Sequence, residues 1–344
     1  MTALQEKTWS GNVTAYAYIV GRIRGLERGL LSNHLLENAL KTEDLEQALR
    51  ILSELPYLNE VLQNASKNPP SIDRALTEHF WQTLSEIIQN QPIAPIAAFF
   101  QMIFDFNDLK LIIKRHLSKS SSEKEYPASF EWKRALRFVA GERNEYLSDV
   151  YRRAIDDALI GYENTHNAQQ VENLLDRAFL VEVKSLSDRC ESRVIKNWLI
   201  AYFIFAYFRA AFRAKFQQTK IDLFRSIYSE NSTIRFEDLS EIITGGDEKG
   251  AEIIIHHGFR QLLPHEGEFQ NNPNFLSEIE KNMDNDLMRI IRPYRIQAFG
   301  PEPVFGFLYA KMTDVRNLRI LLHGKYFNIS ESGIKSKLRE CYYE

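Results

Sequence analysis

The sequence predicts an all-α protein, and three observations support this prediction. Glycine and proline are sparse, with 15 and 11 residues among 344, so few positions interrupt regular backbone. Alternating runs of β-branched residues, which are typical of half-buried strands, are hard to find. A stretch near the C-terminus is repeated upstream with apolar residues at helical spacing. With 44% hydrophobic and 26% charged residues, the chain has the composition of a globular protein with a sizeable core.

The repeated stretch divides the chain into similar parts. Residues 311–325 resemble residues 102–116, because both keep an acid, a second acid or an amide, a leucine and a base in one register. A more divergent third copy, residues 204–213, keeps the large apolar and the basic positions. The copies recur about every hundred residues, which exceeds the roughly 20 to 50 residues of solenoid repeats. The chain is therefore predicted to contain three domain-sized repeats.

The boundaries of these repeats follow from linker composition. A small, polar segment closed by proline, residues 118–127, separates the first two repeats, and a less distinct boundary falls near residues 217–220. Within the last repeat, residues 245–250 and 300–303 are predicted turns between helices. The three repeats are predicted to comprise residues 1–118, 127–217 and 218–344.

The acid and amide positions of the copies identify four candidate repeat-organising residues. Asp105 and Asp108 occupy them in the first copy, and Asp314 and Asn317 in the last. The two acids of the first copy form part of a thin polar strip on a helix predicted over residues 95–117, which is otherwise apolar on several sides and therefore buried. Two interpretations stay open: the acids are satisfied inside their own repeat, or they form an exposed acidic contact for a partner. We expect both pairs to lie inside the repeats.

The longest apolar run belongs to the second repeat. It comprises the eleven residues from Trp198 to Phe208, bounded by Asn197 and Arg209. A membrane-spanning helix needs about 20 residues, so we interpret this run as a core helix. Its aromatic density predicts packing against other parts of the protein.

Cysteine usage and charge restrict the class of protein. Cys190 and Cys341 show no metal-ligand spacing, so we interpret them as free thiols in a reducing compartment. Glu6 and Lys7 precede any apolar run, which is not the pattern of a secretory signal. A net charge of −3 does not favour a basic nucleic-acid-binding protein.

Two groups of residues could be taken for metal ligands. Glu163 and His166 have the Glu-x-x-His spacing of a carboxylate-bridged di-iron bundle, but that site needs a second such pair and two further glutamates. His256, His257 and His265 lack an accompanying cysteine or second ligand pair at zinc-site spacing. We therefore expect no metal and no cofactor.

The remaining catalytic motifs are weak or absent. Asp105 with Asp108, and Asp156 with Asp157, resemble fragments of the acid-rich motifs that hold magnesium diphosphates in all-helical enzymes, but each has only two acids. The sequence has no Gly-x-x-x-x-Gly-Lys-Ser/Thr loop for ATP and no Gly-x-Ser-x-Gly elbow. We therefore predict a protein that is not itself an enzyme, with a metal-dependent enzyme acting on diphosphates as one alternative.

Basic residues gather at both ends of the chain. Arg22, Arg24 and Arg28 cluster near the start, and residues 311–339 hold seven lysines or arginines against two acids. Such a face can meet anionic lipid or an acidic partner, or it can be a solvated face balanced by acids from another repeat. Both interpretations stay open. The candidate partner contacts are Arg24, Arg28, Lys325, Tyr326, Arg339 and Tyr342.

Three blocks of sequence resemble one known family. The first runs from residues 16–27 to residues 52–57, the second combines residues 175–179 with residues 213–215, and the third covers residues 303–343. In order and spacing they resemble the C subunits of the prokaryotic V/A-type rotary ATPases, the counterparts of the d subunit of the eukaryotic V-ATPase, over nearly the whole chain.

The sequence departs from the pattern of this family at two places. In the middle copy, where the family usually keeps an Asp and an Asn, this chain has Ile204 and Tyr207. In the last copy, the usual Glu ahead of the Asn-Leu-Arg element is Asp314, which keeps the charge and shortens its reach.

The resemblance implies a fold and a mechanical function. It implies three similar helical domains with approximate threefold pseudo-symmetry, forming a funnel or cup. One copy would lie on the cytoplasmic face of the membrane as a peripheral part of the central stalk, receiving the rotor shaft made of the D and F subunits and resting on the membrane proteolipid ring. It would pass torque between them during ATP hydrolysis or synthesis and ion transport. An unrelated helical scaffold is the second alternative.

Overall fold

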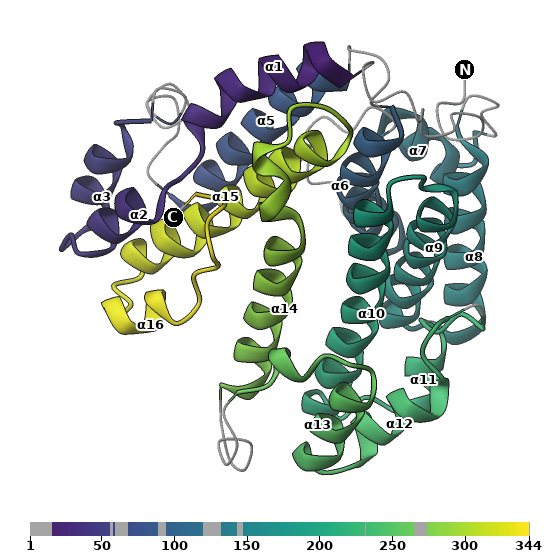
Figure 1. Cartoon of the computed structure of the whole chain (residues 1–344). Coiled ribbons are helices and arrows are strands. Elements are labelled where there is room, and N and C mark those ends of the chain that lie inside the picture. The colour runs from purple at the N-terminus through teal and green to yellow at the C-terminus, as the bar shows by residue number, and fades with distance from the viewer. Residues whose placement is uncertain are drawn as a thin grey trace. The chain divides into compact units, whose positions relative to one another are not determined.

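The computed structural model describes residues 16–55, 58, 68–88, 94–119, 132–142, 147–230, 232–264 and 274–343. Every regular element within these ranges is a helix, and the only β-type pairing there is an isolated bridge between Ser32 and Tyr343. The predicted all-α class is confirmed (Figure 1). The helices are α1 (Ala17–Leu26), η2 (Glu27–Gly29), α2 (Asn33–Leu40), α3 (Leu45–Leu52), α5 (Pro69–Ile88), α6 (Ala94–Ser118), α7 (Trp132–Val139), α8 (Asp149–Thr165), α9 (Ala168–Arg189), α10 (Arg193–Phe216), α11 (Ile221–Arg225), α12 (Phe236–Thr244), α13 (Asp247–His256), η3 (Arg260–Leu262), α14 (Phe275–Ile291), η4 (Arg292–Ile296), α15 (Glu302–Tyr326) and α16 (Glu331–Lys335).

Contacts divide the chain into two compact units. The described residues of unit 1 run from Ala94 to Arg260, and those of unit 2 lie before Ala94 and from Gln261 onward. The boundaries of these units differ from those predicted for the repeats, because α6 belongs to unit 1 and not with the residues that precede it. The division into three repeats, the threefold arrangement and the cup stay predictions.

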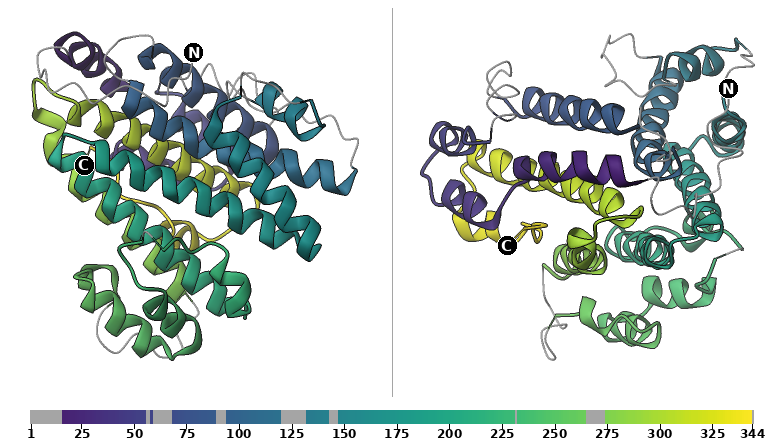
Figure 2. Two further views of the ribbon diagram at one scale, coloured as in Figure 1. Left: turned by 90° about the vertical axis from the view of Figure 1, so that its right-hand side faces the viewer. Right: turned by 45° about the horizontal axis from the view of Figure 1, so that its top comes forward.

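Unit 1 is built around α9, which packs against α6, α8 and α10 (Figure 2). On α10, apolar side chains are buried on all sides, as expected of a central helix. Trp198, fully buried, stacks on Tyr202 at a centroid distance of 5.4 Å and meets the edge of Phe99 from α6, also at 5.4 Å. Each such aromatic pair adds about 1 kcal/mol beyond the area that it buries.

Among the described helices, α10 alone has the length and hydropathy of a candidate membrane span. The core helix of a globular protein meets the same criterion, so one such helix is weak evidence for a span. The largest side chains of α10 lie inside unit 1, and Trp198, Phe205 and Phe208 are each 0% exposed. The predicted core helix is therefore found in the structure.

Unit 2 is built around α15, which packs against α1, α3, α5, α14 and η4. At two glycines of α15, neighbouring side chains leave no room for a Cβ atom. A Cβ at Gly306 would lie 2.8 Å from the Tyr342 hydroxyl oxygen, and one at Gly324 would lie 2.5 Å from Cγ1 of Ile334. These glycines let the C-terminal segment fold back onto the helix that precedes it.

Candidate functional site

The three copies of the repeated stretch lie on three long helices that end alike. The helices are α6, α10 and α15, with 25, 24 and 25 residues. Each is followed by a residue in the left-handed conformation: Lys119, Gln218 and Asn328 have φ of 51°, 53° and 54°. These are three of the four non-glycine residues with positive φ in the described part of the chain, and such residues are uncommon. They occupy one register position of the copies, so the copies share local structure as well as sequence.

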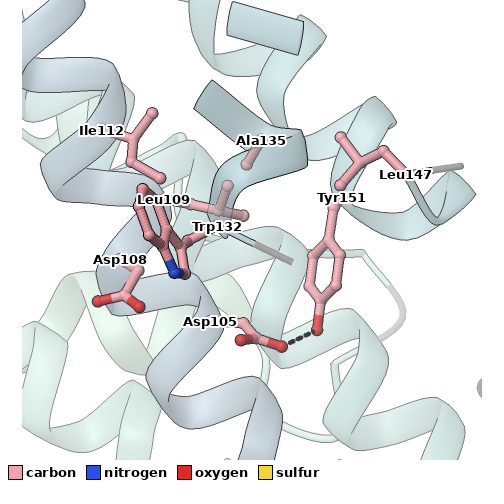
Figure 3. Close-up of a pocket in the computed structure, with 8 residues that line it drawn as sticks. All are labelled: Asp105, Asp108, Leu109, Ile112, Trp132, Ala135, Leu147 and Tyr151. Atoms are coloured by element: carbon pink, nitrogen blue, oxygen red, sulfur yellow. Dashed lines mark hydrogen bonds between the residues drawn. The ribbon is translucent and has the colours of Figure 1, made fainter. Parts of the chain in front are cut away.

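In two of the copies, the carboxylate at the acid position accepts a hydrogen bond from a residue that lies outside its own helix. In unit 1, Asp105 is 3% exposed and its Oδ2 accepts a hydrogen bond from the hydroxyl of Tyr151 on α8 at 2.5 Å (Figure 3). In unit 2, Asp314 is 0% exposed and its Oδ2 accepts a hydrogen bond from the backbone N–H of Leu31 at 2.9 Å. The middle copy has Ile204 there, 9% exposed, and replaces the polar bond by apolar packing.

Three residues after the acid position, a polar side chain hydrogen-bonds the backbone of the segment that follows the helix. Asn317, 0% exposed, donates from Nδ2 to the Arg339 carbonyl at 3.0 Å, and its Oδ1 accepts from the Arg339 N–H at 2.8 Å. In the middle copy, the hydroxyl of Tyr207 accepts from the Ser229 N–H at 3.1 Å. Both bonds join residues that are 22 positions apart. Burial raises the pKa of Tyr207 to about 12, so its hydroxyl stays neutral. Tyr207 thus makes in the middle copy a bond like that of Asn317 in the last copy, which sequence reasoning missed.

The basic positions of the copies pair with a neighbouring helix of the same unit. Lys110 on α6 contacts Asp176 on α9 at 2.5 Å. The residue in the same register on α15, Arg319, contacts Asp73 on α5 at 3.0 Å, and His323 contacts the same carboxylate at 3.2 Å. These side chains are partly exposed, so each pair contributes roughly 1 kcal/mol or less. Their value lies in fixing the register between helices.

A small pocket lies beside the first copy and contains both of its acids (Figure 3). Its residues come from α6, α7 and α8 and the chain before α8: Asp105, Asp108, Leu109, Ile112, Trp132, Ala135, Leu147 and Tyr151. The cavity measures about 10 Å³, which is room for roughly one water molecule. Among the described residues, this space is smaller than a diphosphate.

The histidines considered as metal ligands have other surroundings. His166 follows the last residue of α8 in the left-handed conformation. His257 contacts Asp238 through Nε2 at 3.1 Å, while His265 lies outside the described residues. Within the described ranges, no three His, Cys, Asp or Glu side chains come together as a metal site would require.

Lys311 and Asp314 form a buried ionisable pair one helical turn apart on α15. Their exposed fractions are 4% and 0%. Burial raises the pKa of Asp314 to about 7, against the opposing charge of Lys311 and the Leu31 N–H. Burial also lowers the pKa of Lys311 to about 8, against the attraction of Asp314. Burial thus favours the neutral form of both groups.

Three of the candidate partner contacts are used inside unit 2. Lys325, 8% exposed, donates from Nζ to the Leu40 carbonyl at 2.7 Å and also to the Thr42 carbonyl. The Arg339 Nε contacts Asp284 Oδ2 at 3.0 Å. Tyr342 is 1% exposed, and burial raises its pKa. These side chains present little surface to another protein.

The other three candidates differ in exposure. Arg24 contacts Glu27 at 2.8 Å and donates to the Gln297 carbonyl at 2.7 Å, which leaves it half-buried. Arg28 is exposed, and Tyr326 is 42% exposed at the end of α15. Of the six residues, Arg28 and Tyr326 are therefore the ones that another protein can reach directly.

Comparison with known proteins assigns these helices to a family. The sequence pattern of the ATP synthase (C/AC39) subunit family matches residues 19–337. The C subunit of the V-type sodium ATPase of Enterococcus hirae is 23% identical over 93% of this chain and 97% of its own length. The C subunits of the A-type ATP synthases of Methanocaldococcus jannaschii and Methanothermobacter thermautotrophicus are 19% and 23% identical, over 95% and 90% of this chain and 87% and 84% of theirs. The chain belongs to the ATP synthase (C/AC39) subunit family of V/A-type ATPases.

Proposed function

We propose that this chain is the non-catalytic central-stalk adapter of a V/A-type rotary ATPase. It joins the rotor shaft, formed by the D and F subunits, to the proteolipid ring in the membrane, with one copy in each complex. It carries torque from the ATP sites to the ring during hydrolysis and in the reverse direction during synthesis. It is peripheral to the membrane, on the cytoplasmic face, and is held there by protein contacts.

The observation that carries this proposal is the recurrence of one long helix, with the same end, in three copies. α6, α10 and α15 have nearly the same length and the same left-handed end. On α10 and α15 a polar side chain at one register position ties down the chain 22 residues further on. Torque transfer requires stiffness, and close-packed interiors with fastened connections deform little and transmit strain. No reactive group is needed for this function.

The exposed end of α15 is the surface that we propose for a rotor partner. Tyr326, Phe327 and Ile329 are 42%, 62% and 46% exposed and follow one another at the end of the helix. Contiguous exposed apolar side chains mark protein interaction sites more often than scattered ones. The nearby cavity of about 240 Å³, lined by Leu40 and Lys325 among others, is part of the same surface.

A pull-down from membranes tests the proposed function. The tagged full-length chain, expressed in its own cells and extracted in mild detergent, should bring down the D and F subunits and the proteolipid. Phe327→Ser should weaken this co-purification. The matched control is Ile160→Ser on α8, which removes a side chain of similar exposure, 55%, from unit 1. Recovery of the chain without any shaft or ring protein would reject the adapter function, whereas equal binding by both variants would reject only the surface.

A further inference from the structure

The acid of the last copy is buried in a way that a charged carboxylate tolerates poorly. Asp314 is 0% exposed, and its Oδ2 has one hydrogen bond, from the Leu31 N–H. Its Oδ1 is buried without a hydrogen-bond partner among the described residues. Burying an ionised carboxylate is costly unless several donors or a close cation compensate for it. The free Oδ1 can take a proton without the loss of any existing bond.

The segment that covers this acid is short and is held at both ends. The Leu31 N–H binds Asp314 just before α2, and Ser32 forms the isolated bridge with Tyr343. After α2, the carbonyls of Leu40 and Thr42 accept hydrogen bonds from Lys325 on the same helix, α15. Local opening of the chain at residues 30–32 would therefore bring water to Asp314 while Lys325 still holds the far end of α2.

We propose that Asp314 is a proton-controlled latch: its neutral carboxyl holds the chain at residues 30–32 against α15, and its ionisation loosens that segment. The inference stands on the contacts within unit 2 and does not require the adapter function. If the chain is the adapter, the latch makes its stiffness around α15 depend on pH near neutrality.

Charged and titratable groups also lie on the elements that pack against α15. They include Arg24 of α1, His79 of α5, Asp284 of α14 and Arg292 of η4, and further groups are Glu27 of η2 and Cys341 of the C-terminal segment. The charges of α3 and α16 are exposed: Glu46, Arg50, Glu331 and Lys335.

Two titratable groups that interact electrostatically with the pair stay neutral between pH 5 and 8. Burial, with the nearby charge of Lys311, lowers the pKa of His79 to about 4. Burial, with the nearby charge of Asp314, raises the pKa of the Cys341 thiol to about 12. Of the groups inside the latch, Asp314 thus titrates within this range, with Lys311 at its upper edge.

The sign of the effect follows from proton linkage. The closed state raises the pKa of Asp314, so the opened segment, with a solvated carboxyl, binds fewer protons than the closed one. Raising the pH therefore favours opening, by up to roughly tenfold per pH unit, until Asp314 is ionised in the closed state as well.

Hydrogen exchange of the full-length chain tests the latch. The protection factor of the Leu31 amide, corrected for the intrinsic pH dependence of exchange, should fall between pH 5 and 7 and then level off. Asp314→Asn keeps an acceptor oxygen but cannot ionise, so its protection should not depend on pH. Lys311→Met removes the cation that favours ionisation in the closed state, so the fall should continue to higher pH before it levels off.

Control variants separate the latch from ordinary histidine titration, because histidines as a class change charge in this pH range. Two variants should leave the pH dependence of Leu31 protection unchanged. They are His34→Gln, at an exposed position on α2, and His323→Gln, near the C-terminal end of α15. Constant protection of Leu31 from pH 5 to 8 would overturn the proposal. So would a fall of equal size in Asp314→Asn, or a fall abolished by either histidine variant.

Discussion

Replacing Asn317 by alanine gives the most direct measure of the fastening that recurs in the copies. The side chain is 0% exposed and bonds both backbone groups of Arg339, at 2.8 and 3.0 Å. Each hydrogen bond contributes roughly 1 kcal/mol, and a buried N–H left without a partner costs a further 1 to 3 kcal/mol. Asn317→Ala should therefore lower the free energy of unfolding of unit 2 by about 3 to 5 kcal/mol.

Urea titration followed by hydrogen exchange and mass spectrometry measures this loss locally. Peptides from α15 and from residues 336–343 should lose protection at lower urea in Asn317→Ala, while peptides from α9 in unit 1 keep theirs. Asn317→Asp keeps the acceptor for the Arg339 N–H but turns a second carboxylate oxygen toward the Arg339 carbonyl at a position that is 0% exposed, so its loss should be at least as large. Because the residue is internal, binding to the rotor shaft should weaken only as far as stability does. A folded Asn317→Ala variant with unchanged protection, or one that loses shaft binding alone, would refute the reasoning.

Three further outcomes are expected. Tyr207→Phe removes one hydroxyl and leaves the Ser229 N–H without that bond, so unit 1 should lose about 1 kcal/mol, measured by urea unfolding; an unchanged midpoint would show that the middle copy is not fastened there. Gly324→Ala should destabilise unit 2 by roughly 1 to 3 kcal/mol despite the higher helix propensity of alanine, because its Cβ would lie 2.5 Å from Ile334; a higher melting temperature would contradict this. Burial raises the pKa of Asp314 from 3.8 to about 7, so its contribution to stability is complete below about pH 4 and is lost as pH rises through 7. Between pH 5 and 7, the free energy of unfolding of Asp314→Asn, measured by urea titration, should therefore rise relative to that of the parent. If the two free energies changed with pH in parallel, the predicted direction of the effect would be wrong.

Much of the local structure could be predicted because it depends on neighbours along the chain. Sparse glycine and proline, together with helical spacing, are enough to identify α6, α10 and α15 as long helices, and the apolar run after Asn197 is enough to identify a core helix. Asp105, Asp108, Asp314 and Asn317 are all less than 10% exposed, where the repeated pattern placed them. Their role as organisers of the repeat is supported by the hydrogen bonds of three of them and awaits the variants above.

The partner contacts were harder to predict, because long side chains reach groups that are distant in sequence. Lys325 is 283 positions from Thr42, whose carbonyl it binds, and nothing in the basic stretch 311–339 indicates that partner. Sequence alone presents this lysine as a surface charge. The fold makes it an internal clamp, which leaves Arg28 and Tyr326 as the accessible candidates.

The sequence by itself determined the helical class, the three copies and the family, since periodicity and motif order are local properties that survive without knowledge of contacts. Only the tertiary structure decided what each polar position does. Tyr207 lacks the amide of Asn317, yet its hydroxyl meets the N–H of the returning chain, because the helix and the chain that follows it fold back in the same way. Asp314 became a titrating group because Leu31 and the C-terminal segment exclude water from it, and burial of this kind arises only when distant segments meet.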